Sequence, residues 1–159
     1  YNGRISNHGR NGGRVMKIST RGRYGVRLLI DLAEHMDESH IPLAQIAERQ
    51  NVSARYLEQV AVILKRAGYI RSIKGASGGY TLARNPADVV IGDVLRTLEG
   101  DMLVVDNPRP GEEENRLQRC IRSVVYSCLN ERVASIVDSI SLASIVGTRD
   151  VDAVPMYYI

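Results

Sequence analysis

Several residue types and patterns are scarce or missing in this 159-residue sequence. It has no Trp or Phe, three His, two Cys, and no apolar run that approaches the roughly 18 residues of a membrane span. Two cysteines cannot form a disulfide framework, which argues for a reducing compartment, and the histidines lack the spacing of a zinc site or a nucleophilic triad. We therefore expect a cytoplasmic protein that has no membrane contact and is not an enzyme.

Positive charge is concentrated in the first half of the chain. The net charge of +3 combines +3 for residues 1–15, +5 for residues 16–84 (11 basic and 6 acidic side chains) and −5 for residues 85–159 (7 basic and 12 acidic). A basic N-terminal half suits a polyanion such as nucleic acid. The alternative is a scatter of solvated surface charges without a binding role.

Residues 1–15 carry no hydrophobic periodicity and are rich in Gly, Asn and Arg. This composition predicts a flexible extension rather than a folded element. Either the segment is foreign to the natural protein, since Met16 could itself be a start, or it is a basic arm that touches DNA.

Three amphipathic segments after this extension have the order of a helix-turn-helix motif. Ser19 is a suitable N-cap for a long first helix whose apolar stripe runs to Met36. Residues 42–50 form a short helix, and after a two-residue turn a third helix follows the N-cap Ser53 until Gly68 ends it. A helix that begins with polar side chains after a short turn is typical of helix-turn-helix proteins.

Two short strands, residues 69–73 and 80–83, flank the glycine-rich segment KGASGG. The pattern predicts a β-hairpin, the wing of a winged helix-turn-helix domain that spans residues 16–100. A phosphate-binding P-loop is excluded, because no Gly-Lys-Ser/Thr follows and no helix comes next. We therefore predict a mostly α fold with one small β-hairpin.

A further helix closes at Gly100, and a polar loop, residues 101–114, leads to an apolar helix over residues 115–139. About 36 Å of helix outside a small domain needs a surface that covers its apolar stripe. We predict a homodimer built on residues 115–147, followed by a tail of residues 148–159; the alternative is that the helix packs on its own domain. The residues expected in the dimer interface are Leu117, Ile121, Val124, Cys128, Val133 and Ile136.

The N-terminal part of the third helix carries side chains suited to reading base edges in a major groove. Arg55 could bond guanine, Gln59 adenine and Glu58 cytosine. Ser53 and Tyr56 could hold phosphate. Alternatively, Ser53 acts only as a helix cap and Tyr56 only as a core residue.

Two further places suit the phosphate backbone. The first turn of the first helix offers free backbone N–H groups and the positive end of the helix dipole, which together favour binding of an anion such as phosphate. The alternative is a basic helix end that is only solvated and binds nothing. In the hairpin, Lys74 can reach a phosphate or the minor groove, and the glycines let the backbone approach the duplex. The predicted contacts are Ser19, Thr20, Arg21 and Arg23 in the helix and Lys74, Gly75, Ser77, Gly78 and Gly79 in the hairpin.

A family resemblance rests on three stretches: MKISTRGRYGVRLLIDLA, IPLAQIAERQNVSARYLEQVAVILKRAGYIRSIKGASGGYTLAR and IGDVLRTLEG. With S-x-x-Y-L-E-Q, G-x-x-G-G-Y and L-E-G in this order, the chain from Met16 to about Gly147 resembles the IscR/NsrR/CymR family of winged-helix repressors. The resemblance implies a dimeric repressor that binds double-stranded DNA. A winged helix used only for protein contacts would not need the basic N-terminal half.

The resemblance also bears on a cofactor. Family members similar to IscR and NsrR hold an iron–sulfur cluster with three cysteines between the L-E-G motif and the long helix. Here Asp106 and Asn107 stand near the expected place of the first cysteine, and only Cys120 matches the last. Cys128 lies about 80° round and roughly 12 Å further along the helix, so it suits a buried, inert thiol. We expect no cofactor; the alternative is a redox thiol or a cluster that joins Cys120 across the dimer.

The tail ends in DAVPMYYI, which is apolar and aromatic. A C-terminal carboxylate with an apolar side chain is a ready ligand for backbone N–H groups of another protein, unless the tail folds back on its own dimer. The ending is similar to that of the CymR branch, repressors of cysteine metabolism without cluster cysteines. This similarity implies that Tyr157, Tyr158 and Ile159 bind cysteine synthase, a pyridoxal-phosphate enzyme, and that O-acetylserine releases the complex.

Overall fold

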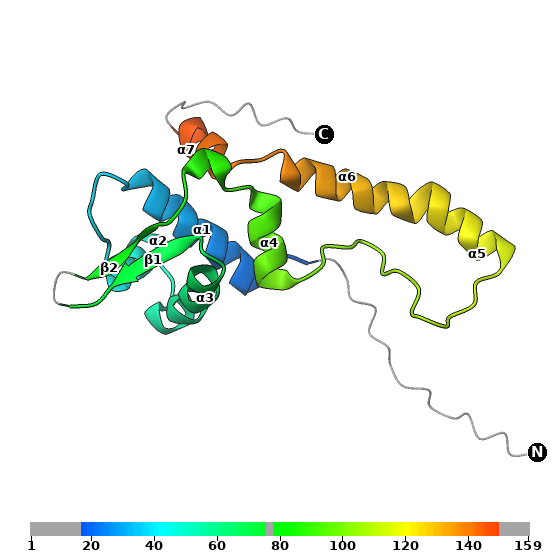
Figure 1. The fold of residues 1–159 in the computed structure, drawn as a ribbon, viewed down its shortest axis with the longest axis horizontal. Helices are drawn as coiled ribbons and strands as arrows, with labels where there is room; N and C mark the ends of the chain where they lie inside the picture. The colour runs from blue at the N-terminus through cyan, green and yellow to red at the C-terminus, as the bar shows by residue number, and fades with distance from the viewer. Residues whose placement is uncertain (1–16, 76–77, 150–159) are drawn as a thin grey trace, which may run out of the picture.

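Figure 1 shows the chain as a computed structural model that describes residues 17–75 and 78–149. The predicted extension, residues 1–15, and residues 150–159 of the predicted tail lie outside the described residues, as does Ser77. The predicted mostly α fold with one β-hairpin is confirmed. In chain order the elements are α1 (Thr20–Glu34), α2 (Leu43–Gln50), α3 (Ala54–Arg66), β1 (Ile70–Ile73), β2 (Gly79–Leu82), η1 (Pro86–Asp88), α4 (Ile91–Glu99), α5 (Arg116–Ile121), η2 (Arg122–Tyr126), α6 (Ser127–Asp138) and α7 (Leu142–Arg149).

Helix α1 begins where the sequence predicts and ends earlier. The hydroxyl of Ser19 accepts hydrogen bonds from the N–H groups of Arg21 and Gly22 (3.1 and 3.4 Å), which confirms Ser19 as the N-cap. The helix ends at Glu34, and Met36 is 53% exposed in the connection that follows. The predicted continuation of the apolar stripe to Met36 was wrong, because the next residues are polar and offer no further face to the core.

Helices α2 and α3 form the predicted helix-turn-helix. Asn51 ends α2 in the left-handed conformation (φ 50°), which Asn tolerates better than most residues, and its N–H bonds to the carbonyl of Glu48. Ser53 holds the N-cap position of α3, but its side chain makes no capping hydrogen bond, contrary to the prediction. Only its carbonyl takes part, accepting from the N–H groups of Tyr56 and Leu57 (3.1 and 3.0 Å).

The hydrophobic core joins five helices, α1, α2, α3, α4 and α7, and one face of the hairpin. Its apolar side chains come from the faces that the helical periodicity predicts, and each fully buried Leu or Ile contributes roughly 1.5–3 kcal/mol. These elements therefore bury one another and form a single unit. The largest fully buried side chains are Leu28, Leu29, Leu32, Ile41, Ile46, Leu57, Val60, Leu64, Ile70, Val89, Leu98 and Leu142.

The wing is fastened to the connection between α1 and α2. Strands β1 and β2 are antiparallel, with the buried Ile70 opposite the buried Leu82. On the other edge of β2, Ile41 and Tyr80 exchange two backbone hydrogen bonds of 2.9 and 2.8 Å. A side chain at Gly79 would meet the backbone of Ile41 at 2.5 Å, so only glycine allows this approach.

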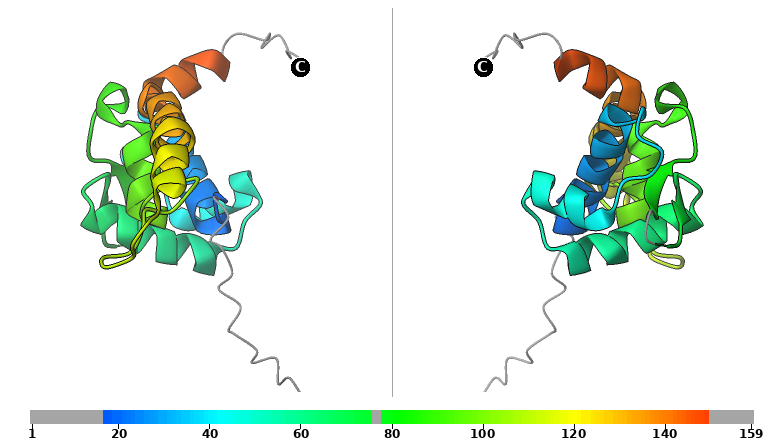
Figure 2. Two further views of the ribbon diagram at one scale, coloured as in Figure 1. Left: turned by 90° about the vertical axis from the view of Figure 1, so that its right-hand side faces the viewer. Right: turned by 90° about the vertical axis from the view of Figure 1, so that its left-hand side faces the viewer.

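Helices α5 and α6, joined by the π-helical turn η2, form one long helix that projects from the rest of the molecule (Figure 1). The left view of Figure 2 looks almost along it. A capping box holds its start, where Asn115 and Gln118 each accept the other's backbone N–H. None of the residues in this long helix is buried. Even so, neither it nor any other helix within the described ranges is long and apolar enough to cross a membrane.

The segments before and after the long helix, the loop of residues 101–114 and helix α7, contact other parts of the chain. Asn130 pins the loop of residues 101–114, because its side chain accepts from the N–H groups of Val104 (2.8 Å) and Val105 (3.2 Å) and donates to the carbonyl of Val105 (3.0 Å). Helix α7 packs on α1 and η1, and its buried Leu142 donates its N–H to the carbonyl of Val89 (2.8 Å). Helix α7 therefore adds to the core of the same chain.

Candidate nucleic-acid interface

Helix α3 turns a polar face outward at its N-terminal end. Arg55, Glu58 and Gln59 are exposed, while Leu57 and Val60 between them are buried and orient the helix. None of the three exposed side chains makes a hydrogen bond or ion pair with another described residue. Their donors and acceptors are therefore free to meet base edges, as predicted from the sequence.

Tyr56 has a packing role. Its ring meets the ring of Tyr24 edge to face, with 5.5 Å between centroids and an interplanar angle of 88°. The guanidinium of Arg27 lies 5.6 Å from the centre of the Tyr24 ring. Of the two roles considered for Tyr56, the structure supports the core role, and the half-buried side chain joins the recognition helix to α1.

A buried carboxylate sets the position of the helix-turn-helix, and the sequence analysis did not identify it. Asp31 of α1 is 1% exposed and accepts from Arg49 Nε and Nη2 (3.1 and 2.5 Å) and from Gln50 Nε2 (2.9 Å). The hydrogen bond that Arg49 donates to Asp31 raises the pKa of the Arg49 guanidinium above its ordinary value. Because Arg49 and Gln50 end α2, these contacts hold the turn into α3 against α1. The signal in the sequence is a single Asp within the apolar run of the first helix.

The N-terminus of α1 is already occupied by an anion. Glu99 Oε1 accepts from Ser19 Oγ (2.6 Å) and from the N–H of Gly22 (2.8 Å). The prediction that this helix end offers free N–H groups was therefore wrong for Arg21, whose N–H bonds to Ser19 Oγ, and for Gly22, whose N–H bonds to Ser19 Oγ and Glu99. Arg21 and Arg23 are exposed, and Arg23 Nη2 donates to Thr20 Oγ1 (3.3 Å). The basic part of the predicted backbone clamp, which consists of Ser19, Thr20, Arg21 and Arg23, therefore faces outward.

The wing presents Lys74 at its exposed end. Gly75 follows with φ 121°, a conformation that favours glycine, and the N–H of Gly78 donates to the Gly75 carbonyl (3.0 Å) to close the turn. Gly79 is buried against Ile41, so its role is to let the strands pack rather than to approach DNA. Lys74 makes no hydrogen bond or ion pair with other described residues.

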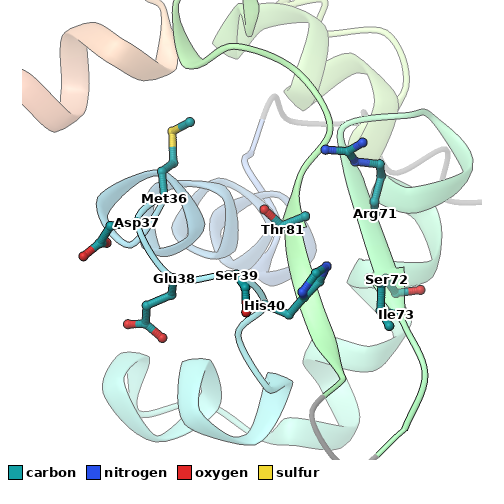
Figure 3. A pocket seen from close by; sticks show the side chains of 9 residues that line it. All are labelled: Met36, Asp37, Glu38, Ser39, His40, Arg71, Ser72, Ile73 and Thr81. Atoms are coloured by element: carbon teal, nitrogen blue, oxygen red, sulfur yellow. The ribbon is translucent and has the colours of Figure 1, made fainter.

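A pocket of about 560 Å³ lies on the other side of the wing, between the α1–α2 connection and the outer face of the hairpin (Figure 3). His40 lies beside Thr81, and Arg71 extends from β1 toward the same strand. The side chains of these three residues make no hydrogen bond or ion pair within the described part of the chain. None of the residues predicted to contact DNA lines this pocket, so it is separate from the predicted interface.

Comparison with known proteins decides the family. Residues 18–148 match the family model described as "Rrf2: Iron-dependent Transcriptional regulator". The chain belongs to the Rrf2 family. This confirms the resemblance predicted from the motifs. Because its Rrf2 relatives IscR and CymR are transcriptional regulators, the expectation of a regulator rather than an enzyme is also confirmed.

Individual Rrf2 proteins are similar over most of the chain. CymR of Bacillus subtilis is 39% identical over 128 residues, which are 77% of this chain and 93% of that protein. IscR of Serratia proteamaculans is 33% identical over 138 residues, 86% of this chain and 82% of that protein. The solved structures of B. subtilis CymR and T. potens IscR superpose with TM-scores of 0.73 and 0.69, both at 35% identity, over 84% and 89% of this chain and 98% and 96% of theirs.

Within one chain, the described residues of this Rrf2 protein do not bring together the ligands of an iron–sulfur cluster. Such clusters take cysteine ligands, with His replacing some of them in certain centres. Within residues 17–75 and 78–149, no three His, Cys, Asp or Glu side chains lie close enough to hold a metal. Cys120 and Cys128 are both exposed on the long helix. In the single chain no described residue covers the Cys128 thiol, so its burial in a dimer stays a prediction.

Proposed function

We propose that the chain is a homodimeric repressor that presents two copies of α3 and two wings to one palindromic duplex. The observation that carries this proposal is the exposed, unpartnered face of α3, with Arg55, Glu58 and Gln59, on a helix that packs against β1 of the wing. These side chains discriminate base edges, and a free lysine such as Lys74 suits a phosphate.

The uncovered long helix supports the dimer. Leu117 and Val124 are each 68% exposed and Ile136 is 62% exposed, which is costly for apolar side chains in water. Of the other predicted interface residues, Cys128 is exposed and Ile121 and Val133 are half-buried. A second copy of the same helix would cover this face and give the two-fold symmetry of a palindrome, with half-sites at multiples of about 10 bp. Equilibrium sedimentation that finds a monomer at micromolar concentration would contradict the dimer.

Two substitutions test the interface with DNA. Lys74→Ala should weaken binding to all duplexes and lower the salt slope by about one, because one phosphate contact is lost. Gln59→Ala should cost roughly 1–3 kcal/mol on the operator and mainly relax its sequence preference. Titrations of an operator selected from random oligonucleotides, and of a scrambled duplex, over a range of salt separate the two roles. A Lys74→Ala protein with altered sequence preference and an unchanged salt slope would show that the wing is assigned wrongly.

We further propose that the regulated genes serve cysteine metabolism. The proposal is supported by the similarity to CymR, whose solved structure is described as that of the global cysteine regulator of B. subtilis, and by the poor fit of a cluster to the described residues. In this proposal Ile159, with Tyr157 and Tyr158, enters the substrate pocket of cysteine synthase. O-acetylserine competes for that pocket, releases the complex and relieves repression.

Deletion of Tyr158 and Ile159 tests this partner. The shortened protein should no longer capture purified cysteine synthase, while its dimer and its intrinsic DNA binding should persist. Addition of O-acetylserine should release the enzyme from the full chain. Undiminished capture of the enzyme by the shortened protein would exclude the tail as the binding site for cysteine synthase. Stoichiometric iron in protein purified without oxygen would instead favour the cluster-sensing function of IscR-like relatives.

A further inference from the structure

Glu99, in the L-E-G motif, makes a contact that the DNA-binding function does not explain. It is the last residue of α4, and its half-buried carboxylate accepts from Ser19 Oγ (2.6 Å) and from the N–H of Gly22 (2.8 Å). A negative charge at this end of α1 is favourable, because it meets the positive end of the helix dipole. Glu99 is therefore an internal anion in the place where an external phosphate is expected.

Two glycines of α1 make room for this contact. A Cβ atom at Gly22 would lie 2.4 Å from Glu99 Oε1, and one at Gly25 would lie 2.2 Å from Leu98 Cδ1. Both positions are buried, so the end of α4 reaches α1 only because these side chains are missing. The R-G-R-Y-G segment of α1 and the L-E-G segment at the end of α4 are far apart in sequence, and they contact each other in the fold.

We propose that Glu99 is a positioning residue that both orders the predicted backbone clamp and limits its affinity for DNA. This inference rests on the proposed function, in which the residues from Ser19 to Arg23 hold the phosphate backbone. The hydrogen bonds of Glu99 fix the first turn of α1, which favours binding. Its charge repels phosphate and occupies the N–H of Gly22, which weakens binding. The two effects have opposite signs and can be separated by mutation.

Glu99→Gln separates them, because an amide oxygen can still accept from Ser19 and Gly22 while the charge is removed. We expect this variant to bind a random-sequence duplex about fivefold more tightly than the wild type at about 50 mM salt, with the difference shrinking as salt screens the charge. A purely structural role predicts no gain in affinity, since a neutral amide oxygen accepts weaker hydrogen bonds than a carboxylate and could only lower the melting temperature and the affinity or leave them unchanged.

Asp88→Asn is the matched control. Asp88 is exposed in η1, takes no part in the contact of Glu99 with Ser19 and Gly22, and its substitution makes the same change in net charge. The experiment measures duplex binding of the full-length wild type and both variants by fluorescence anisotropy across a salt series, with melting temperatures for each. The inference holds if only Glu99→Gln gains affinity. It is overturned if both variants shift equally or if Glu99→Gln binds no more tightly than the wild type. If the wild type itself binds no duplex, the proposed function fails instead.

Discussion

The DNA-binding domain and the long helix differ in how far their apolar side chains are covered by the rest of the chain. Within residues 17–100, apolar faces of α1, α2, α3, α4 and the hairpin cover one another, and among the described residues beyond 100 the buried core includes Leu142 of α7. The long helix has comparable apolar content but no buried residue, and it leaves large side chains in water. The first region thus buries its apolar faces within one chain, whereas the second leaves an apolar face that no described residue covers.

The polar contacts follow the same division. In the DNA-binding domain a buried carboxylate, Asp31, is satisfied by three hydrogen bonds from α2. At the junction with the long helix, Arg96 of α4 pairs with Asp138 at the end of α6 (2.7 Å), and both are partly exposed. Gly92 gives Asp138 room, since a Cβ there would lie 1.9 Å from its carboxylate. The contacts are therefore buried where the fold is closed and solvated where the two regions meet.

The largest expected effect of a substitution is on dimer formation, when a charge is placed on the uncovered face of the long helix. Val124→Asp should raise the dimer dissociation constant by about 100-fold or more, because association would bury an unpaired carboxylate. Operator affinity should fall with it, while the circular dichroism of the DNA-binding domain should remain. Sedimentation and anisotropy measure the two quantities.

Ala87→Asp is the control for this substitution, since it places the same charge on an exposed turn of the DNA-binding domain. It should leave the dimer intact. If Val124→Asp dimerises as well as the control does, the long helix is covered by something other than a second copy, and the contrast between the two regions must be revised.

A smaller effect, on the unfolding free energy, is expected from a substitution in the buried network of the DNA-binding domain. Asp31→Ala removes three hydrogen bonds and leaves the Gln50 Nε2 donor without its acceptor, which should cost about 2 kcal/mol of unfolding free energy. The dimer should persist, because Asp31 lies outside the long helix. Urea unfolding measures the cost, with Asp37→Ala, an exposed acid in the next connection, as the neutral control. Equal stability of the two variants would show that the buried network does not support the domain.

The smallest effect is expected at the junction. The hydrogen bond from Arg96 lowers the pKa of Asp138 below its ordinary value of 3.8. A lowered pKa in the folded state means that the ionised pair stabilises the protein above the ordinary pKa, and that this stabilisation is lost as pH falls through the folded value. Asp138→Asn should therefore lower the melting temperature slightly at neutral pH and not at the acid end of that window. A difference that persists at the lowest pH would assign it to packing at Gly92 instead.

The sequence predicted which face of α3 is exposed, but it did not predict the contacts that hold this helix in place. Arg55 and Gln59 follow from helical period and from the N-cap position, which are local properties. The missing side-chain cap of Ser53, the burial of Gly79 and the π-turn η2 do not follow from local pattern, since each depends on where a neighbouring segment lies. A π-turn also rotates the apolar side chains after it relative to those before it, so a regular helical stripe cannot predict which of them share a face.

By itself, the sequence determined the elements of this protein, their order and the family to which they belong, because caps, glycine turns and apolar periods act over a few residues. Only the tertiary structure decided that Glu99 meets Ser19 across 80 positions, that Asp31 holds the end of α2, and that the long helix stands uncovered. These outcomes depend on the distances between packed helices. Such distances arise from how all the side chains of the core fill space together, and no single stretch of the sequence records them.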